Sequence, residues 1–242
     1  MMNQTKHVLR EKATAFICHL ALSITTLACL FLILKQLWYP GFFFDIDGGI
    51  EGLEIVFFVD VVIGPLLTFT VYKKGKKGLK MDLTLIVIAQ VLCMGWGVLQ
   101  TWKERPLVAV LTGDTFRTMN ASALAFHQIS PDELASFPGD HPKIVFVPPS
   151  SEEASSKQKL KNIFTLGPLY ARHKLYQPIE KAKQHLMEFG YASIADAKAG
   201  TRHSLSGIQG NQPVFLRIEG KFSSGFLEVD PQTGNLKSFY PN

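Results

Sequence analysis

The stretch that decides the fold runs from Trp38 to Pro106: WYPGFFFDIDGGIEGLEIVFFVDVVIGPLLTFTVYKKGKKGLKMDLTLIVIAQVLCMGWGVLQTWKERP. It contains two apolar runs, Leu53–Tyr72 and Met81–Trp102. Each run is about 20 residues long, which is enough for a helix to cross the hydrocarbon core of a bilayer. A helix can cross because it satisfies its own backbone polar groups. The stretch therefore predicts a hairpin of two transmembrane helices.

The loop between the two runs is rich in lysine. Basic residues in short loops favour the cytoplasmic side of the membrane, so this loop predicts the orientation of the hairpin. The residues concerned are Lys73, Lys74, Lys76, Lys77 and Lys80.

A third apolar run, Ala13–Leu34, lies near the N-terminus and follows a short basic segment. A cleaved signal peptide is the alternative, but its apolar region is normally about 7 to 15 residues long. This run is longer, and the residues Trp38-Tyr39-Pro40 after it are typical of a membrane interface. We therefore expect a retained first span.

An odd number of spans carries the remainder of the chain to the side opposite the N-terminus. We expect a cytoplasmic tail over residues 1–12, a three-helix transmembrane domain over 13–104 and a periplasmic α+β domain over 105–242. The fold class predicted is a membrane protein of three transmembrane α-helices followed by a small α+β periplasmic domain. The expected location is the inner membrane of a Gram-negative bacterium.

The α+β assignment rests on alternating strand and helix patterns after Pro106. Strand patterns bounded by proline and glycine turns occupy residues 106–112, 143–147, 214–218, 225–229 and 236–240. Helix patterns occupy residues 150–166 and 176–190, with Gly190 as the stop signal. Ser130 followed by Pro131 is typical of a helix start.

Asp60 is the most unusual residue of the second run, because a carboxylate within a bilayer is costly and commonly functional. By helix rise it lies roughly 18 Å from the cytoplasmic end of its helix. Gln90 lies roughly 13 Å from the cytoplasmic end of the third run, so modest tilt brings the two side chains together. A protonated Asp60 bonded to Gln90 is one interpretation, and a contact to a partner helix is the other. Gly64-Pro65, one turn later, predicts a kink.

The composition argues against several classes of function. The net charge of +5 is concentrated in the lysine loop, so we expect no nucleic-acid binding. The three cysteines lie in apolar runs, where we expect core residues rather than a disulfide or metal site. No motif predicts a metal, a cofactor or a small-molecule substrate.

An intramembrane or periplasmic hydrolase acting on an envelope substrate is the alternative hypothesis, and its intramembrane form would use Asp60 and Asp82 as an aspartyl dyad. A catalytic dyad needs two carboxylates a few ångströms apart. Asp82 opens the third helix at its cytoplasmic end, and Asp60 lies far deeper, so we expect no dyad and no enzymatic activity.

The order and spacing of motifs between Trp38 and Pro106 resemble the type IV pilin accessory proteins of the TfpX/TfpZ family. The features that carry the resemblance are Trp38-Tyr39-Pro40, Gly48-Gly49 with Gly52-Leu53, Val59-Asp60, Gly64-Pro65-Leu66-Leu67-Thr68, Lys77 with Leu79-Lys80, Asp82-Leu83, Gln90 and Arg105-Pro106. The segment after Pro106 matches only loosely, chiefly in the turn Asp230–Gly234.

This resemblance implies a non-enzymatic chaperone that binds and stabilises the major type IV pilin and promotes pilus assembly. The expected partners are the pilin, through its membrane helix and its periplasmic head, and the lipid bilayer. The candidate partner-binding residues are Trp38, Tyr39, Pro40, Asp60, Gly64, Pro65, Asp82, Gln90 and Arg105.

Overall fold

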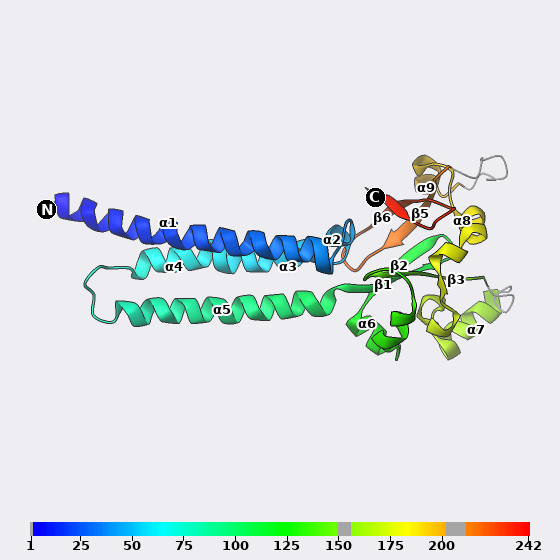
Figure 1. Ribbon diagram of the computed structural model, residues 1–242, viewed down its shortest axis with the longest axis horizontal. Coiled ribbons are helices and arrows are strands. Elements are labelled where there is room, and N and C mark those ends of the chain that lie inside the picture. The colour runs from blue at the N-terminus through cyan, green and yellow to red at the C-terminus, as the bar shows by residue number, and fades with distance from the viewer. Residues whose placement is uncertain (1, 150–155, 202–211) are drawn as a thin grey trace. The chain divides into compact units, whose positions relative to one another are not determined.

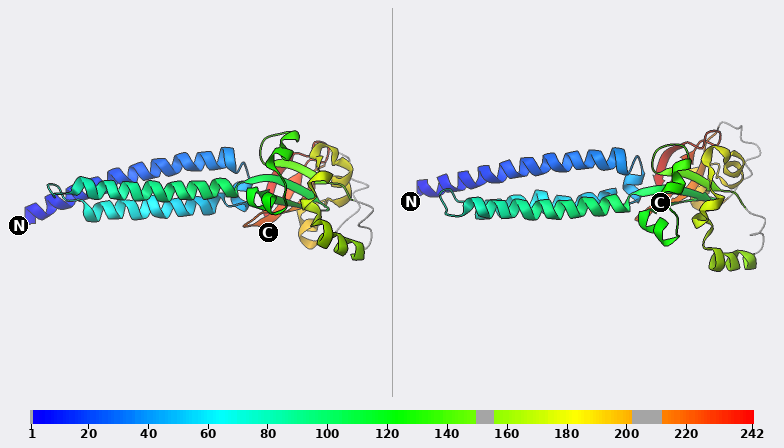
Figure 2. Two further views of the ribbon diagram at one scale, coloured as in Figure 1. Left: turned by 90° about the horizontal axis from the view of Figure 1, so that it is seen from below. Right: turned by 60° about the horizontal axis from the view of Figure 1, so that its bottom comes forward.

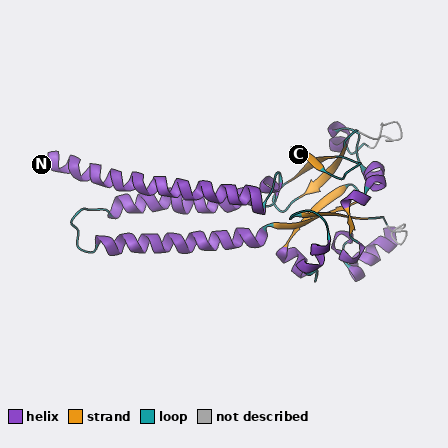
Figure 3. Ribbon diagram, viewed as in Figure 1, coloured by secondary structure: helices purple, strands orange, loops and turns teal. Residues whose placement is uncertain are grey.

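The computed structural model describes residues 2–149, 156–201 and 212–242. The chain divides into two compact units, which are best described separately. The first unit comprises Met1–Phe44 and Gly48–Lys103, and the second comprises Asp45–Asp47 and Glu104–Asn242. Every strand of the described chain lies in the second unit, as the colouring by secondary structure shows (Figure 3).

The first unit contains three helices long and apolar enough to cross a membrane: Lys6–Trp38, Gly49–Val71 and Leu79–Glu104. The prediction of three spans is confirmed. The first consists of α1 (Met2–Ile33) and its continuation Leu34–Trp38, and the third is α5 (Leu79–Glu104). Figure 1 shows α1 lying along the second span, and contacts between α1 and α4 confirm that the two are neighbours. Figure 2 gives two further views of the three helices.

The segment between the first two spans is shorter than expected. The second span begins before Leu53, where the apolar run starts, because α3 (Gly49–Val56) is helical, and the short helix α2 (Phe43–Ile46) precedes it. Gly48 precedes α3 with a φ of 109°, a left-handed backbone conformation that glycine adopts without steric strain. The turn at Gly48 therefore lets the second span begin at once.

The second span changes its helical geometry in the middle. It runs through α3, a π-helical segment at Phe57–Ile63 and α4 (Gly64–Val71). Pro65 has no backbone N–H, and the Gly64 N–H bonds the carbonyl of Val59, five residues earlier. The expected disturbance at Gly64-Pro65 thus takes the form of a widened turn, and such π-helical turns are frequent at functional sites.

The outer surface of the first unit is apolar. Only 6% of the most apolar part of α5 is buried within the chain, which suits a helix that faces lipid or another protein. Cys18, Cys29 and Cys93 are all exposed on this surface. The expectation that they are core residues is therefore wrong, since each points away from the helix contacts.

The second unit is built on one seven-stranded sheet with strand order β4-β3-β1-β2-β5-β6-β7. β1 pairs in parallel with β3, and β2 pairs in parallel with β5, while the other neighbours are antiparallel. The strands are β1 (Pro106–Thr112), β2 (Thr115–Asn120), β3 (Lys143–Val147), β4 (Gln177–Pro178), β5 (Val214–Glu219), β6 (Ser224–Val229) and β7 (Leu236–Pro241).

Helices cover both faces of this sheet. On one face, Val108, Val110 and Val145 pack with Leu124 of α6 (Ala121–Phe126) and Leu134 of the 3₁₀ helix Pro131–Ser136. The alternate residues of these strands point to the other face of the sheet, where the ring of Phe146 contacts that of His185 in α8 (Lys183–Phe189). The other α-helices described in this unit are α7 (Ser156–Leu166) and α9 (Ile194–Ala199), and single 3₁₀ turns occupy Leu169–Ala171, His173–Leu175 and Ile179–Lys181. The α+β prediction for this part of the chain is confirmed.

Several predicted elements differ from the observed ones. The helix predicted over residues 176–190 is wrong in its first half, because a residue before proline favours extended backbone. Gln177 and Pro178 instead form β4, and α8 begins only at Lys183. Part of the predicted helix over residues 150–166 falls on residues 150–155, which lie outside the described residues, while Ser156–Leu166 is helical. Ser130 caps a 3₁₀ helix with a complete capping box.

The short segment Asp45–Asp47 belongs to the second unit although it lies between the first two spans in sequence. The carbonyl of Ile46 accepts hydrogen bonds from the N–H groups of Phe222 at 2.9 Å and Ser223 at 3.3 Å. A Cβ atom added to Gly220 would lie 2.6 Å from the same carbonyl oxygen, so the turn after β5 must carry glycine there. This segment is thus built into the folded domain.

Candidate functional site: an intramembrane polar groove

A pair of polar side chains lies in the middle of the helical unit. The Gln90 side-chain amide of α5 donates a long hydrogen bond of 3.4 Å to Oδ1 of Asp60, in the π-helical segment. Asp60 is only 6% exposed. The expected contact between these two residues is confirmed. The long distance leaves Asp60 incompletely satisfied, since good N–H···O bonds are about 2.9 Å long.

A second polar pair connects the first and second spans. Nδ1 of His19 in α1 lies 2.6 Å from Oγ1 of Thr68 in α4, and Thr68 is buried. Both side chains thus find a hydrogen-bond partner within the helical unit. Interhelical bonds of this kind are worth about 0.6 kcal/mol on average in membrane proteins.

A groove of about 120 Å³ opens beside the Asp60–Gln90 pair. All three spans contribute to it, and the exposed apolar residues Leu22, Val87 and Val91 flank the polar ones. A groove with apolar walls and an incompletely satisfied carboxyl group suits a further transmembrane helix that carries one polar residue. The lining residues are His19, Leu22, Ser23, Thr26, Asp60, Val87, Gln90, Val91 and Met94.

Gly64 allows the second and third spans to approach at this level. A Cβ atom added to Gly64 would lie 2.0 Å from Nε2 of Gln90, so a larger residue there would push the amide away from its position beside Asp60. Gly64 and Pro65 are both buried. A Cβ atom added to Gly95, further along α5, would have no other atom of the chain within 4 Å, so Gly95 does not limit how closely the helices approach.

The other predicted site residues lie elsewhere in the chain and not in the groove. The Tyr39 hydroxyl donates to the carbonyl of Thr101 at 2.7 Å, and the ring of Trp38 contacts that of Trp102 at a centroid distance of 4.9 Å. These contacts connect the end of the first span to the end of the third, and Pro40 follows them directly in sequence. Arg105 belongs to the second unit.

Asp82 is engaged at the lysine-rich loop. Its Oδ2 atom pairs with Nζ of Lys76 at 2.6 Å. Asp60 and Asp82 therefore take part in different contacts, which gives no support to an aspartyl dyad. Among the residues that the structure describes, no group of three or more His, Cys, Asp or Glu side chains is arranged to hold a metal ion.

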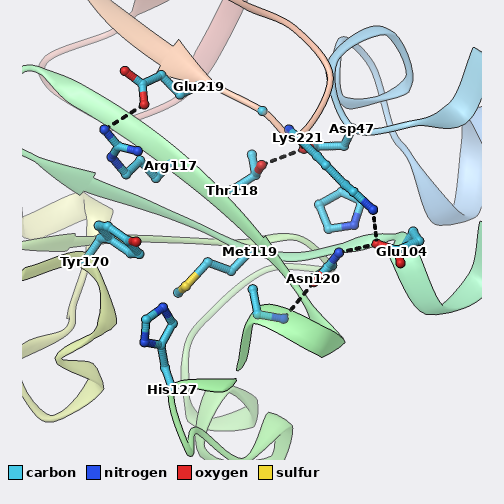
Figure 4. Close-up of a pocket in the computed structure, with 13 residues that line it drawn as sticks. Asp47, Glu104, Arg117, Thr118, Met119, Asn120, His127, Tyr170, Glu219 and Lys221 are labelled. Atoms are coloured by element: carbon cyan, nitrogen blue, oxygen red, sulfur yellow. Dashed lines mark hydrogen bonds and ion pairs between the residues drawn. The ribbon is translucent and has the colours of Figure 1, made fainter. Parts of the chain in front are cut away.

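The second unit contains a separate cavity of about 350 Å³ (Figure 4). It lies where β2 continues past its last pair with β5, Arg117 with Glu219, so that the sheet opens between Thr118 and the turn at Lys221. Sequence reasoning missed this cavity, because nothing in the pattern indicated that Asp47 is buried. The charged lining residues are Asp47, Glu104, Arg117, Glu219 and Lys221.

Asp47 is held by two donors and is almost completely buried at 2% exposure. Its Oδ1 atom accepts hydrogen bonds from the Thr118 hydroxyl at 2.5 Å and from the Lys221 backbone N–H at 3.0 Å. Burial raises the pKa of Asp47 to about 6, although both hydrogen bonds and the Lys221 ammonium group act in the opposite direction. Burial also lowers the pKa of His127, which lines the same cavity.

No family model matches the chain, and no solved structure gives a significant match. The chain is similar to fimbrial assembly proteins. The fimbrial assembly protein of Dichelobacter nodosus serogroup I is 28% identical over 139 residues, which cover 56% of this chain and 52% of that protein. The protein of serogroups C1 and C2 is 27% identical over 131 residues, which cover 53% of this chain and 98% of that protein.

The chain spans about half the length of the serogroup I relative, and the same holds for the serogroup E1 protein, which is 26% identical over 139 residues. These likenesses support the fimbrial assembly part of the resemblance found in Trp38–Pro106. They do not single out the TfpX/TfpZ family.

The role of Gly64 in positioning Gln90 can be tested by Gly64→Ala. The added methyl group displaces the Gln90 amide, so the contact with Asp60 is lost and the bundle is destabilised by about 0.5 to 2 kcal/mol. Unfolding of the purified protein in detergent, followed by circular dichroism, measures the change. Gly95→Ala is the matched control and should not lower stability, because its methyl group meets no other atom and alanine favours a helix over glycine. Equal effects of the two substitutions would contradict the assignment.

The raised pKa of Asp47 predicts how the stability of the second unit depends on pH. Between pH 3.8 and about 6 the folded state keeps the Asp47 proton while the unfolded state loses it. The free energy of unfolding therefore falls as pH rises through this window and then stays lower, by up to about 3 kcal/mol. Asp47→Asn removes this contribution, so the variant should be more stable than the natural protein at pH 7.5 and nearly equal at pH 3.5. Pulse proteolysis in urea measures both, and a lower stability of the variant at pH 7.5 would refute the prediction.

Proposed function

We propose that this protein is a non-enzymatic accessory factor of type IV pilus assembly that binds the major pilin within the inner membrane. The observation that carries the proposal is the groove at Asp60 and Gln90, in a chain similar to proteins named fimbrial assembly proteins. The membrane helix of a subunit that is not yet assembled must be kept from unproductive contacts with other membrane proteins. A groove formed by three spans offers such a helix a temporary place.

The proposed orientation follows from charge. The loop between α4 and α5 carries five lysines, so we place it with the N-terminal tail in the cytoplasm. The second unit then lies in the periplasm, on the same side as the head of a pilin. Two tethered contacts, one in the membrane and one in the periplasm, raise the effective concentration of each, so neither needs high affinity.

Asp60 is the proposed polar anchor of the membrane contact. Its bond to Gln90 is long, and a donor or acceptor from a docked helix completes its hydrogen bonding. The exposed flanks of the groove, Leu22 on α1 with Val87 and Val91 on α5, supply the apolar contact area. Gly64 and Pro65 shape the site, and we expect no covalent chemistry there.

The groove can be tested by photocrosslinking in piliated cells. A photoreactive residue placed at Val87, which lines the groove and is 54% exposed, should crosslink to the major pilin. The matched control is Leu85, which is 58% exposed and outside the groove lining, so it should give little product. Pilin captured equally from both positions, or from neither, would reject the groove as the docking site.

The same experiment identifies the role of the carboxyl group. Asp60→Asn keeps a hydrogen-bonding side chain and should retain most of the crosslink from Val87, whereas Asp60→Leu should reduce it about fivefold or more, as expected for the loss of about 1 kcal/mol.

Deletion of the whole protein should lower the pilin level and surface piliation. Normal pili in the deletion strain would contradict a role in assembly.

A further inference from the structure

The cavity of the second unit contains an unequal set of charges. Three carboxylates and two cationic side chains line it. Each cation already has a carboxylate partner: Arg117 pairs with Glu219 at 2.7 Å, and Lys221 pairs with Glu104 at 2.6 Å. Asp47 is the carboxylate left over, and its two hydrogen bonds come from uncharged donors (Figure 4). The charged side chains that line the cavity therefore carry one more negative charge than positive charge.

One oxygen of Asp47 is incompletely satisfied. Oδ2 is buried and has no hydrogen-bond partner among the described residues. A buried acceptor without a partner costs about 1 to 3 kcal/mol, and more when the group is charged. At neutral pH Asp47 is ionised, since its pKa of about 6 lies below that value. A cationic donor that reached Oδ2 would remove this cost.

The surroundings favour a side chain with an apolar stem. Met119 and Tyr170 line the cavity beside the charged residues (Figure 4). Phe126, next to the lining residue His127, is 82% exposed, and Phe222, next to Lys221, is 50% exposed. Lysine and arginine bury an aliphatic stem against apolar surface and place the charged head in a polar site. These exposed aromatic residues, adjacent in sequence to the lining, also suit the apolar neighbours of such a residue in a polypeptide.

An anionic ligand fits this cavity less well. It would have to break the pair of Arg117 with Glu219 or that of Lys221 with Glu104, and it would then lie beside the ionised Asp47. The volume of about 350 Å³ lies within the usual range for small-ligand sites, so the cavity has room for one long side chain.

We propose that this cavity binds a lysine or arginine side chain of a partner polypeptide, with the cationic head bonded to Asp47. The proposal rests on the charge balance and burial of the domain itself. It holds whether or not the membrane groove binds pilin.

The test uses the full-length protein in detergent, labelled with ¹³C at the aspartate carboxyl carbons. Asp47→Asn assigns the Asp47 signal and serves as the binding control. Propylammonium and propylguanidinium are titrated at constant ionic strength, with tetramethylammonium as a cation that cannot donate a hydrogen bond. We expect a saturable shift of the Asp47 signal with the two donors only, and a fall of its pKa by about one unit or more at saturation.

By linkage, a fall of one unit means that the donors bind about tenfold more tightly at pH 7.5 than at pH 4.5. A Leu-Lys-Leu peptide with blocked ends should bind at least tenfold more tightly than propylammonium, and the same peptide with norleucine in place of lysine should not shift Asp47. No shift with either donor, or an equal shift with tetramethylammonium, would overturn the cation site. A blocked peptide that binds no better than propylammonium would overturn the polypeptide as its source.

Discussion

The absence of water from the bilayer core governs the organisation of the helical unit. A polar side chain that lies there must find its partner within the protein, because lipid tails offer none. The two interhelical contacts, Asp60 with Gln90 and His19 with Thr68, follow from this constraint. They connect the second span to both of its neighbours and fix the level at which the spans meet. The groove then opens where the Asp60 bond is long and its satisfaction incomplete.

The same balance of burial and hydrogen bonding recurs in the second unit at Asp47. Water is available to that domain, yet folding buries the carboxyl group and supplies donors to one oxygen only. Such incomplete sites are uncommon, since nearly all buried polar groups in proteins are paired. Asp60 and Asp47 thus share one physical feature, a buried acid with hydrogen-bonding capacity to spare, in two different solvents. Both are reasonable points of attachment for a partner.

Local pattern predicted most of the membrane unit, because the physics of a span depends on length and composition. The meeting of Asp60 with Gln90 followed from helix rise alone, since two antiparallel helices of known ends fix the depth of every residue. Helix rise could not predict that Gly64 lies beside Gln90, because this depends on the rotation of each helix about its axis, which packing decides. The same limit explains why the cysteines were expected in the core.

The second unit was less predictable because its sheet is assembled from distant pairs. β2 was missed although Gly113-Asp114 forms a two-residue turn to it, since its polar residues hide the alternation. The helix predicted from Tyr176 failed at Pro178, where extended backbone adds a strand to the sheet edge. Most informative is Asp47, whose burial depends on Thr118 and Lys221, 71 and 174 residues away in sequence. A site that joins such distant segments exists only in the folded domain, so its chemistry must be reasoned from contacts. That is also why a cavity of this kind can recognise a partner without any recognisable motif in the chain.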